Sequence, residues 1–151
     1  MATEFKPRIL IADDNPQGAE LLEAYLDELE AEVAIAADGE ETLRLVEQWK
    51  PDLVLLDVMM PRISGFEVCK RLRSDDRTRD LAILMVTALD QPSDVDRAVD
   101  AGTDDFMTKP INKTELLLRV RSLLKNRHLP RELDRALAYF SEVESASRHT
   151  Q

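Results

Sequence analysis

Short apolar runs alternate with amphipathic stretches along most of the chain. Uninterrupted runs occupy residues 9–12, 53–56 and 81–86, residues 33–36 show a more alternating pattern, and a weaker run lies near residues 105–108. Continuous apolar runs of this length are typical of parallel strands buried on both faces, whereas alternation is typical of a strand at a sheet edge. The pattern therefore predicts five strands, with the second strand at an edge.

Helical spacing separates these runs. Apolar residues recur three or four positions apart in sets such as Leu22, Leu26 and Leu29, then Val95, Ala98 and Val99, then Leu117, Val120 and Leu124. Helix start signals precede several helical stretches, at Asn15-Pro16, Asp38, Ser64 and Asn112. Gly102 is a stop signal. Five strand–helix units from Arg8 to about Arg127 predict an α/β domain with a doubly wound, five-stranded parallel sheet, whose ligand site belongs at the carboxyl ends of the strands.

The pattern changes after Arg127. Pro130 can open a new helix, and apolar residues follow at spacings near 3.5 residues, at Leu133, Leu137, Phe140 and Val143. We therefore divide the chain into a domain at residues 8–127 and a helical extension at residues 128–151, with a frayed end. The apolar stripe could pair with a second subunit, dock on its own domain or lead into a further domain. It falls short of the roughly three heptads that indicate a coiled coil.

Charge and composition limit the classes of partner. Among the 151 residues, 20 Lys and Arg stand against 30 Asp and Glu, and the formal net charge of −10 opposes contact with nucleic acid or an anionic membrane. Cys69 is the single cysteine, which excludes a disulfide framework. The first residues lack the features of a signal peptide, and no stretch is apolar enough to span a bilayer. We expect protein partners and a cytoplasmic location.

Polar residues with complementary chemistry follow the predicted strands. Asp13 and Asp14 come after the first strand, Asp57 ends the third, Thr87 follows the fourth and Lys109 follows the fifth. All five should converge at one rim of the sheet, where three carboxylates repel one another unless a cation neutralises them. Mg²⁺ is the expected cation, because it binds carboxylates and serves phosphoryl chemistry. With an ammonium as counter-charge and a hydroxyl donor, such a rim suits a carboxylate that accepts a phosphoryl group.

Each of these residues also has an ordinary explanation. An Asp-Asp pair before a helix start is common turn and cap chemistry, and the other three could be a strand-end acid, a β-branched strand residue and a surface charge. Their coincidence at the ends of successive strands favours a shared site, because this class of fold places its ligands there.

Five motifs occur in order along the domain. They lie at residues 9–15 (ILIADDN), 55–61 (LLDVMMP), 64–67 (SGFE), 86–88 (VTA) and 108–110 (TKP). Together they resemble the response regulator receiver family of two-component signal transduction, from about Arg8 to Arg127. The resemblance implies a flavodoxin-like sheet with strand order 2-1-3-4-5.

The resemblance also implies roles for the acidic residues. Asp57 would accept the phosphoryl group from the phosphohistidine of a sensor histidine kinase. Asp14, Asp57 and the backbone carbonyl of Met59 would bind Mg²⁺ directly, with Asp13 assisting through water. Such a domain is not an enzyme for external substrates, since it catalyses only its own phosphorylation and dephosphorylation.

A switch follows from the same resemblance. Thr87 and Lys109 would bind the phosphoryl oxygens, and the Lys109-Pro110 bond would be cis. Thr87 would move toward the phosphoryl group while Phe106, the aromatic residue of the fifth strand, turns inward; core packing is the other explanation for Phe106. The surface of the fourth helix, fifth strand and fifth helix would then change and bind a downstream protein, an output domain or a second copy.

Two further features concern the output of the domain and the lifetime of its phosphoryl group. Val68-Cys69-Lys70 and residues 109–111 are similar to receivers found ahead of diguanylate cyclase domains, although receivers are exchanged among many effectors. Leu89, two residues after Thr87, could shade the acyl phosphate from water, which leads to the hypothesis of a long-lived phosphoryl group.

Three other classes of protein share part of this pattern. A phosphatase of the haloacid-dehalogenase type needs a second acid two residues after its nucleophile, where this chain has Met59. Nucleotide-binding enzymes of similar topology are disfavoured because neither G-x-G-x-x-G nor G-x-x-x-x-G-K-[ST] occurs. A receiver-like scaffold that binds proteins without being phosphorylated remains the alternative.

Overall fold

The strands form a single parallel sheet. A computed structural model describes residues 6–126, 137, 139–144 and 146 of the chain. The strands are β1 (Arg8–Ala12), β2 (Glu32–Ala36), β3 (Leu53–Leu56), β4 (Ala82–Thr87) and β5 (Asp105–Thr108). They pair in the order β2-β1-β3-β4-β5, all in parallel. The predicted fold class and strand order are confirmed, and the alternating second strand lies at an edge.

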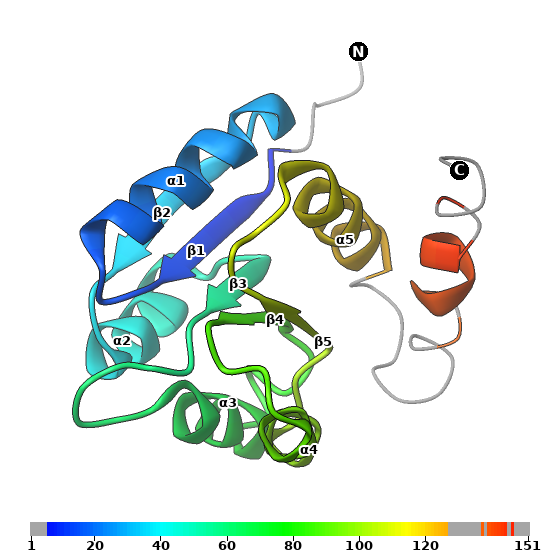
Figure 1. The fold of residues 1–151 in the computed structure, drawn as a ribbon. Helices are drawn as coiled ribbons and strands as arrows, with labels where there is room; N and C mark the ends of the chain where they lie inside the picture. The colour runs from blue at the N-terminus through cyan, green and yellow to red at the C-terminus, as the bar shows by residue number, and fades with distance from the viewer. Residues whose placement is uncertain (1–5, 127–136, 138, 145, 147–151) are drawn as a thin grey trace.

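Helices cover both faces of the sheet. They are α1 (Pro16–Leu26), α2 (Gly39–Trp49), α3 (Gly65–Ser74), α4 (Pro92–Ala101) and α5 (Lys113–Asn126), with a short 3₁₀ turn, η1 (Asp27–Leu29), after α1. Figure 1 shows α1 and α5 on one side of the sheet and α2, α3 and α4 on the other. This is the doubly wound arrangement, in which ligands bind outside the carboxyl ends of the strands.

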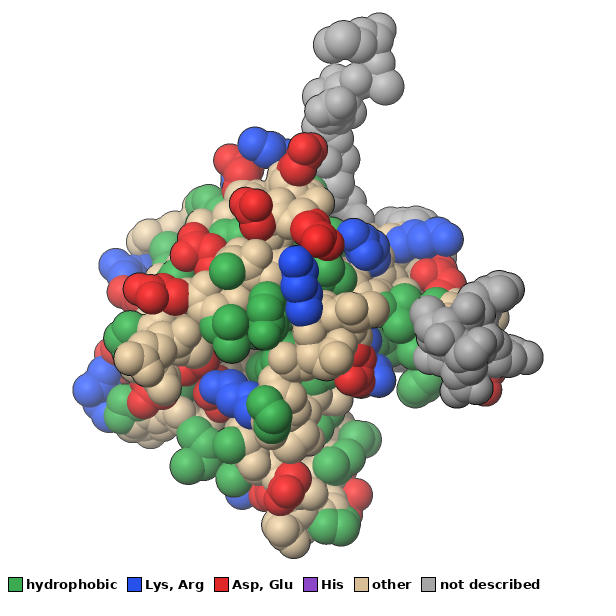
Figure 2. All heavy atoms as spheres, turned by 45° about the horizontal axis from the view of Figure 1, so that its top comes forward, with side chains coloured by type: hydrophobic (Ala, Val, Ile, Leu, Met, Phe, Trp, Pro, Cys, Tyr) green, Lys and Arg blue, Asp and Glu red, His purple; other side chains and the backbone are tan. Residues whose placement is uncertain are grey.

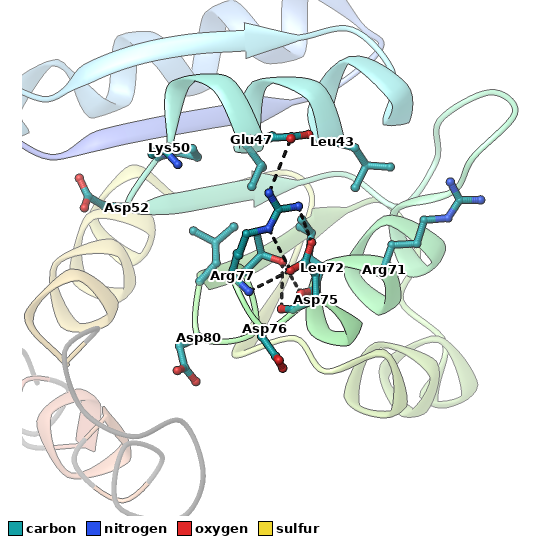
Figure 3. Close-up of a pocket in the computed structure, with 14 residues that line it drawn as sticks. Leu43, Glu47, Lys50, Asp52, Arg71, Leu72, Asp75, Asp76, Arg77 and Asp80 are labelled. Atoms are coloured by element: carbon teal, nitrogen blue, oxygen red, sulfur yellow. Dashed lines mark hydrogen bonds and ion pairs between the residues drawn. The ribbon is translucent and has the colours of Figure 1, made fainter.

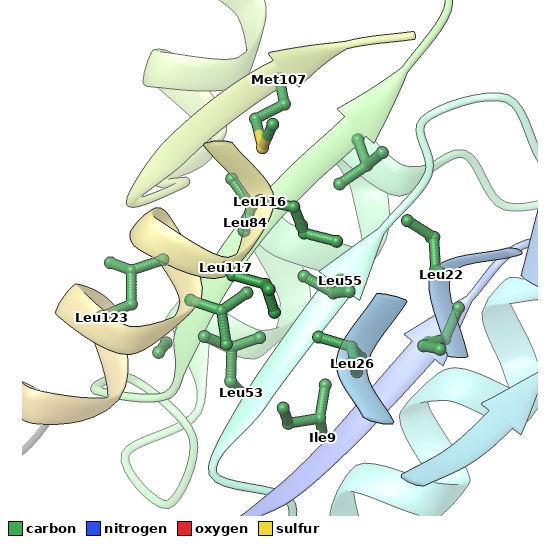
Figure 4. Packing of buried hydrophobic residues seen from close by; sticks show 14 of the residues in the cluster. Ile9, Leu22, Leu26, Leu53, Leu55, Leu84, Met107, Leu116, Leu117 and Leu123 are labelled. Atoms are coloured by element: carbon green, nitrogen blue, oxygen red, sulfur yellow. The ribbon is translucent and has the colours of Figure 1, made fainter. Parts of the chain in front are cut away.

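Two hydrophobic clusters lie one on each face of the sheet, because successive strand residues point to opposite faces. The α1–α5 cluster includes Ile9, Leu26, Leu55 and Leu117, and the α3–α4 cluster includes Leu10, Leu56, Phe66 and Ile83. Figure 4 shows the first of these, with leucines of α1 and α5 meeting over β1 and β3. Each large side chain that is buried in this way contributes about 1.5–3 kcal/mol. The two clusters therefore hold the rim of the sheet in place.

Side chains at the helix ends match the start and stop signals in the sequence. Asn15, Asp38, Ser64 and Asn112 each accept a hydrogen bond from a backbone N–H in the first turn of a helix. Gly102 ends α4 with a φ of 99°, a left-handed conformation that residues with a side chain rarely adopt. These predicted boundaries are confirmed.

A short helical segment follows α5 and contacts the domain. Residues 137, 139–144 and 146 are helical, whereas the expected helix start at Pro130 and Leu133 lies outside the described residues. Of the predicted apolar stripe, Leu137 and Phe140 are 58% and 61% exposed. Tyr139, which the stripe does not include, is buried in the α1–α5 cluster. The structure thus favours docking among the three uses considered for the extension.

The surface carries mixed charge. On the face that Figure 2 shows, acidic and basic side chains are interspersed with hydrophobic ones, and the described residues form no extended basic patch there. This mixture agrees with the formal net charge of −10. No helix in the described part of the chain has the length and hydrophobicity needed to span a membrane.

Candidate functional site

Three of the predicted site residues meet at the carboxyl ends of the strands. Asp13 follows β1, Asp57 follows β3 and Lys109 follows β5. The Nζ atom of Lys109 donates to Asp57 Oδ2 at 2.9 Å and to Asp13 Oδ2 at 3.1 Å. One ammonium therefore joins two carboxylates that come from separate strands, and the predicted convergence is confirmed for these three residues.

Backbone hydrogen bonds that extend the sheet hold these side chains in place. The N–H of Asp57 donates to the carbonyl of Ala12 at 2.9 Å, and the N–H of Asp13 donates to the carbonyl of Ala36 at 3.0 Å. The N–H of Lys109 donates in the same way to the carbonyl of Thr87 at 2.8 Å. Each residue thus lies one step beyond a strand and is still bonded to the neighbouring strand, so the site has a rigid backbone frame.

The two carboxylates are also fixed by their own loops. Asp13 Oδ1 accepts from the N–H of Asn15 at 2.9 Å, and Asp57 Oδ1 accepts from the N–H of Met59 at 3.0 Å. These are Asx turns, in which an aspartate accepts from the backbone two residues later. One oxygen of each carboxylate is therefore held by the backbone while the other faces Lys109.

Two glycines let helices approach the site closely. A Cβ atom at Gly65 would lie 2.3 Å from the carbonyl oxygen of Asp57, so α3 can begin there only without a side chain. A Cβ atom at Gly18 in α1 would lie 2.8 Å from Asp13 Oδ2. Sequence reasoning missed Gly18, although a glycine inside a helix is unfavourable and usually has a packing reason.

Burial makes the charges of the site strongly interdependent. Asp13 and Asp57 are 3% and 6% exposed. Burial lowers the pKa of the Lys109 ammonium, but the hydrogen bonds and negative charges of Asp57 and Asp13 outweigh that effect, so the pKa of Lys109 is raised. Lys109 therefore stays protonated as the shared counter-charge of two buried carboxylates.

The donor set at this rim suits an oxygen-liganded cation. Asp13 and Asp57 together outnumber the single ammonium, and Asp14 is exposed beside them in the chain. Hard divalent cations such as Mg²⁺ prefer carboxylate and carbonyl oxygens. Within the described ranges, however, no three His, Cys, Asp or Glu side chains are grouped so that they could hold a metal ion as they stand. The structure brings two of the three expected carboxylates together, and the metal-binding role of Asp14 stays a prediction.

The expected switch residues lie on the neighbouring strands. Thr87, the last residue of β4, is fully buried, and its Oγ1 accepts from the N–H of Leu89 at 3.4 Å. Phe106 in β5 is half-buried and packs against the α3–α4 cluster. The Lys109-Pro110 bond is cis, as the resemblance implied. The backbone carbonyl of Thr87 accepts from the N–H of Lys109, whereas no contact between Phe106 and the three site residues is seen in the described part of the chain. The movement of Thr87 and Phe106 stays a prediction.

A hollow of about 510 Å³ lies at the other end of the sheet. Its lining comes from the ends of α2 and α3 and from the loops before β3 and β4. It includes none of Asp13, Asp57 and Lys109, which we call the acidic rim. Figure 3 shows Arg77 paired with its neighbour Asp75 at 3.0 Å and extending toward Glu47 of α2 at 3.7 Å. Because exposed ion pairs of this kind are ordinary surface chemistry, the rim remains the candidate site.

Comparisons with known proteins point to one family. A family model described as the response regulator receiver domain matches residues 9–121. The DNA-binding dual master transcriptional regulator RpaA of Synechocystis sp. strain PCC 6803 is 46% identical over 119 residues, which are 79% of this chain and 49% of that protein. Response regulator PleD of Caulobacter vibrioides strain NA1000 is 43% identical over 118 residues, 78% of this chain and 26% of PleD. The chain thus spans about half of the first relative and about a quarter of the second.

One solved structure is similar in fold and contains a metal ion. It is the receiver domain of the sensor histidine kinase PA1611 from Pseudomonas aeruginosa PAO1, with a magnesium ion coordinated in its active-site cleft. The two chains are 27% identical with a TM-score of 0.74, and the match covers 80% of this chain and 99% of that one.

Proposed function

The chain belongs to the response regulator receiver family, and on that basis we propose that Asp57 accepts a phosphoryl group from the phosphohistidine of a sensor histidine kinase. Receivers of two-component systems are phosphorylated on an aspartate by such kinases. The observation that supports Asp57 is its buried carboxylate at the end of β3, which shares the Lys109 ammonium with Asp13.

The side chains of the rim suit this transfer. A carboxylate oxygen of Asp57 attacks phosphorus and forms an O–P bond while the N–P bond of the phosphohistidine breaks, and the electron pair of that bond stays on the imidazole. The product is an acyl phosphate on Asp57. The ammonium of Lys109 can neutralise negative charge on the phosphoryl oxygens, because it already lies 2.9 Å from Asp57 Oδ2. The hydroxyl of Thr87 would donate to a second phosphoryl oxygen.

The same rim would hold Mg²⁺. Asp14, Asp57 and the backbone carbonyl of Met59 would bind the ion, with Asp13 reaching it through water. When bound, Mg²⁺ neutralises charge on the phosphoryl oxygens. The magnesium in the similar PA1611 receiver and the surplus of carboxylate over ammonium in this chain both support the assignment.

The consequence for partners is a changed surface. Movement of Thr87 and Phe106 would alter the face of α4, β5 and α5, to which a downstream protein, an output domain or a second copy of the chain would bind. The chain would act only on itself, without turnover of an external phosphate ester. Its location would be the cytoplasm, whose reducing conditions suit a chain with a single buried cysteine, Cys69.

Intact mass after incubation with acetyl phosphate and Mg²⁺ tests the acceptor. We expect the native chain to gain one phosphoryl group, whereas Asp57→Asn and a metal-free sample gain none, because the amide is a poor nucleophile and the phosphoryl charge is then unneutralised. Asp52→Asn is the matched control, since Asp52 precedes the same strand at its other end, and it should be modified like the native chain.

The opposite result would favour the alternative function. If the native chain gains no mass while a known receiver is modified in the same buffer, the chain is better described as a receiver-shaped scaffold that binds proteins without phosphorylation. Modification of Asp57→Asn to the native extent would instead place the acceptor at another residue.

The lifetime of the phosphoryl group should depend on Leu89. Its side chain is half-buried and packs against the α3–α4 cluster, two residues after Thr87. We expect Leu89→Asn to hydrolyse its acyl phosphate several-fold faster than the native chain, because a polar side chain there admits water to the rim. Loss of the added mass with time after removal of the donor measures the rate, and an unchanged rate would exclude this shielding role.

A further inference from the structure

A tyrosine from beyond the five-unit domain is part of the hydrophobic core. Tyr139 is 4% exposed and belongs to the α1–α5 cluster, together with Met107 of β5 and with Leu116 and Val120 of α5. Half-buried Val143, one helical turn further along, packs against the same cluster. The segment formed by residues 137, 139–144 and 146, which we call the docked segment, is therefore held on the domain by apolar contacts.

The phenol of Tyr139 has a charged acceptor inside this contact. It donates to Asp105 Oδ2, the same oxygen that accepts from Arg119 Nη1, and Arg119 also lies 3.4 Å from the phenol oxygen. Burial and the charge of Asp105 raise the pKa of Tyr139, while Arg119 lowers it by less, so the phenol keeps its proton. The hydrogen bond from the buried hydroxyl to a carboxylate therefore fixes where the segment docks and strengthens its attachment to the domain.

A second polar contact lies one turn away on the docked segment. Glu142 Oε1 accepts from Asn126 Nδ2 at 3.2 Å and is 3.6 Å from Lys125 Nζ. Asn126 is 5% exposed, and its Nδ2 also donates to the carbonyl of Ser122. The segment is thus attached to β5 by one residue and to the last turns of α5 by another.

The strand β5, whose Asp105 accepts the hydrogen bond from Tyr139, also ends at the acidic rim. Asp105 is the first residue of β5, Phe106 is the second, and Lys109 follows the last. The side chain of Asp105 also accepts from the N–H of Phe106 at 2.8 Å. The strand β5 has only four residues and is closely packed, so it cannot easily absorb a movement at one end. A shift of Lys109 would therefore also move Asp105, which accepts the hydrogen bond from Tyr139.

From this arrangement we propose that the docked segment is an intramolecular latch, which Tyr139 holds closed over β5 and α5 and which rearrangement of the acidic rim releases. In this structure the latch is closed, and Lys109 is bonded to both Asp13 and Asp57. The proposal rests on the proposed function only for the event that drives release, the arrival of a phosphoryl group on Asp57. An open latch exposes the surface around Asp105 and Arg119 to a partner that the closed latch excludes.

Amide hydrogen exchange of residues 139–144 in the full chain tests the latch. Tyr139→Phe keeps the ring and removes only the hydroxyl, so exchange of this peptide should become roughly tenfold faster, the factor implied by loss of one charge-assisted hydrogen bond. The matched control is Tyr25→Phe, which removes the same atom from the other tyrosine, in α1, and should leave the peptide unchanged. Equal exchange in all three proteins would overturn the latch.

Coupling to the rim is measured on the same peptide in two ways. Lys109→Met removes the connection between β5 and the acid pair, and we expect exchange of residues 139–144 to rise more than that of β1 and β3; Lys113→Met, with an exposed ammonium, should have no such effect. If exchange in β1 and β3 rises as much as in residues 139–144, the variant unfolds globally. The proposed coupling between the acidic rim and the latch is then wrong.

Phosphorylation provides the second measurement of coupling. In a sample whose mass shows the added phosphoryl group, exchange of residues 139–144 should rise several-fold, and Asp57→Asn under the same conditions should stay at the resting value. A phosphorylated chain with unchanged exchange overturns the coupling and leaves the proposed function standing. Failure to gain mass overturns the proposed function, while the Lys109→Met comparison still decides the coupling.

Discussion

Arg73→Ala should lower the free energy of unfolding by about 3–5 kcal/mol, because the buried carboxylate of Asp104 loses the guanidinium that neutralises it. The side chains of Arg73 and Asp104 are 12% and 11% exposed, and Arg73 Nη2 lies 3.1 Å from Asp104 Oδ2. The guanidinium also donates to the carbonyls of Gly102 and Leu81 at 2.8 Å and 2.7 Å. One side chain of α3 therefore ties together the end of α4 and the starts of β4 and β5.

Equilibrium unfolding in urea measures this loss, and the same helix offers a control. Arg71 pairs with Glu67 at 3.1 Å, but both side chains are about half exposed, so Arg71→Ala should cost less than about 1 kcal/mol. Arg73→Lys should also be destabilising, because an ammonium cannot reproduce the several directed donors of a guanidinium. Similar losses for Arg71→Ala and Arg73→Ala would contradict a structural role for the buried pair.

Lys109→Met should cost about 3 kcal/mol of folding stability in the presence of EDTA, since two buried carboxylates lose their shared counter-charge. Mg²⁺ should restore much of this loss, because an ion that binds the folded state stabilises it by mass action. The variant should bind Mg²⁺ more tightly than the native chain, whose ammonium competes for Asp13 and Asp57.

Urea unfolding with EDTA and with Mg²⁺ provides the comparison. Lys113→Met is the control, because Lys113 pairs at 3.1 Å with Glu28 and both side chains are about half exposed. Its cost should stay below about 1 kcal/mol and should not depend on Mg²⁺. If Mg²⁺ has no effect on Lys109→Met, the cation does not bind at this rim.

The sheet and the centre of the site could be predicted from the sequence because the signals are local. Apolar runs such as residues 53–56 identify buried strands, and a polar residue directly after a run must lie at the carboxyl end of that strand. Asp57 and Lys109 were located in this way, without knowledge of any long-range contact. Such signals do not say whether exposed Asp14 turns toward the rim, which depends on the loop and on the cation.

The interactions missed by the sequence analysis depend on tertiary partners. Arg73 lies in a charged helix end that has the composition of a solvated surface, and only the return of β5 supplies its partner Asp104. Tyr139 is missing from the predicted stripe because the spacing of Leu137 and Phe140 indicated a different buried face. The tyrosine is buried because Asp105 and Arg119 satisfy its hydroxyl, and no local pattern contains that information.

The distance in sequence between the members of the rim has a consequence for biosynthesis. Lys109 is separated by 96 residues from Asp13 and by 52 residues from Asp57. A chain emerging from the ribosome therefore exposes Asp57, the proposed acceptor, long before Lys109, and β5 can pair only after β4 has been placed. If the proposed function holds, competence to receive a signal would arise only with the last strand of the sheet, and incomplete chains would not take part in signalling.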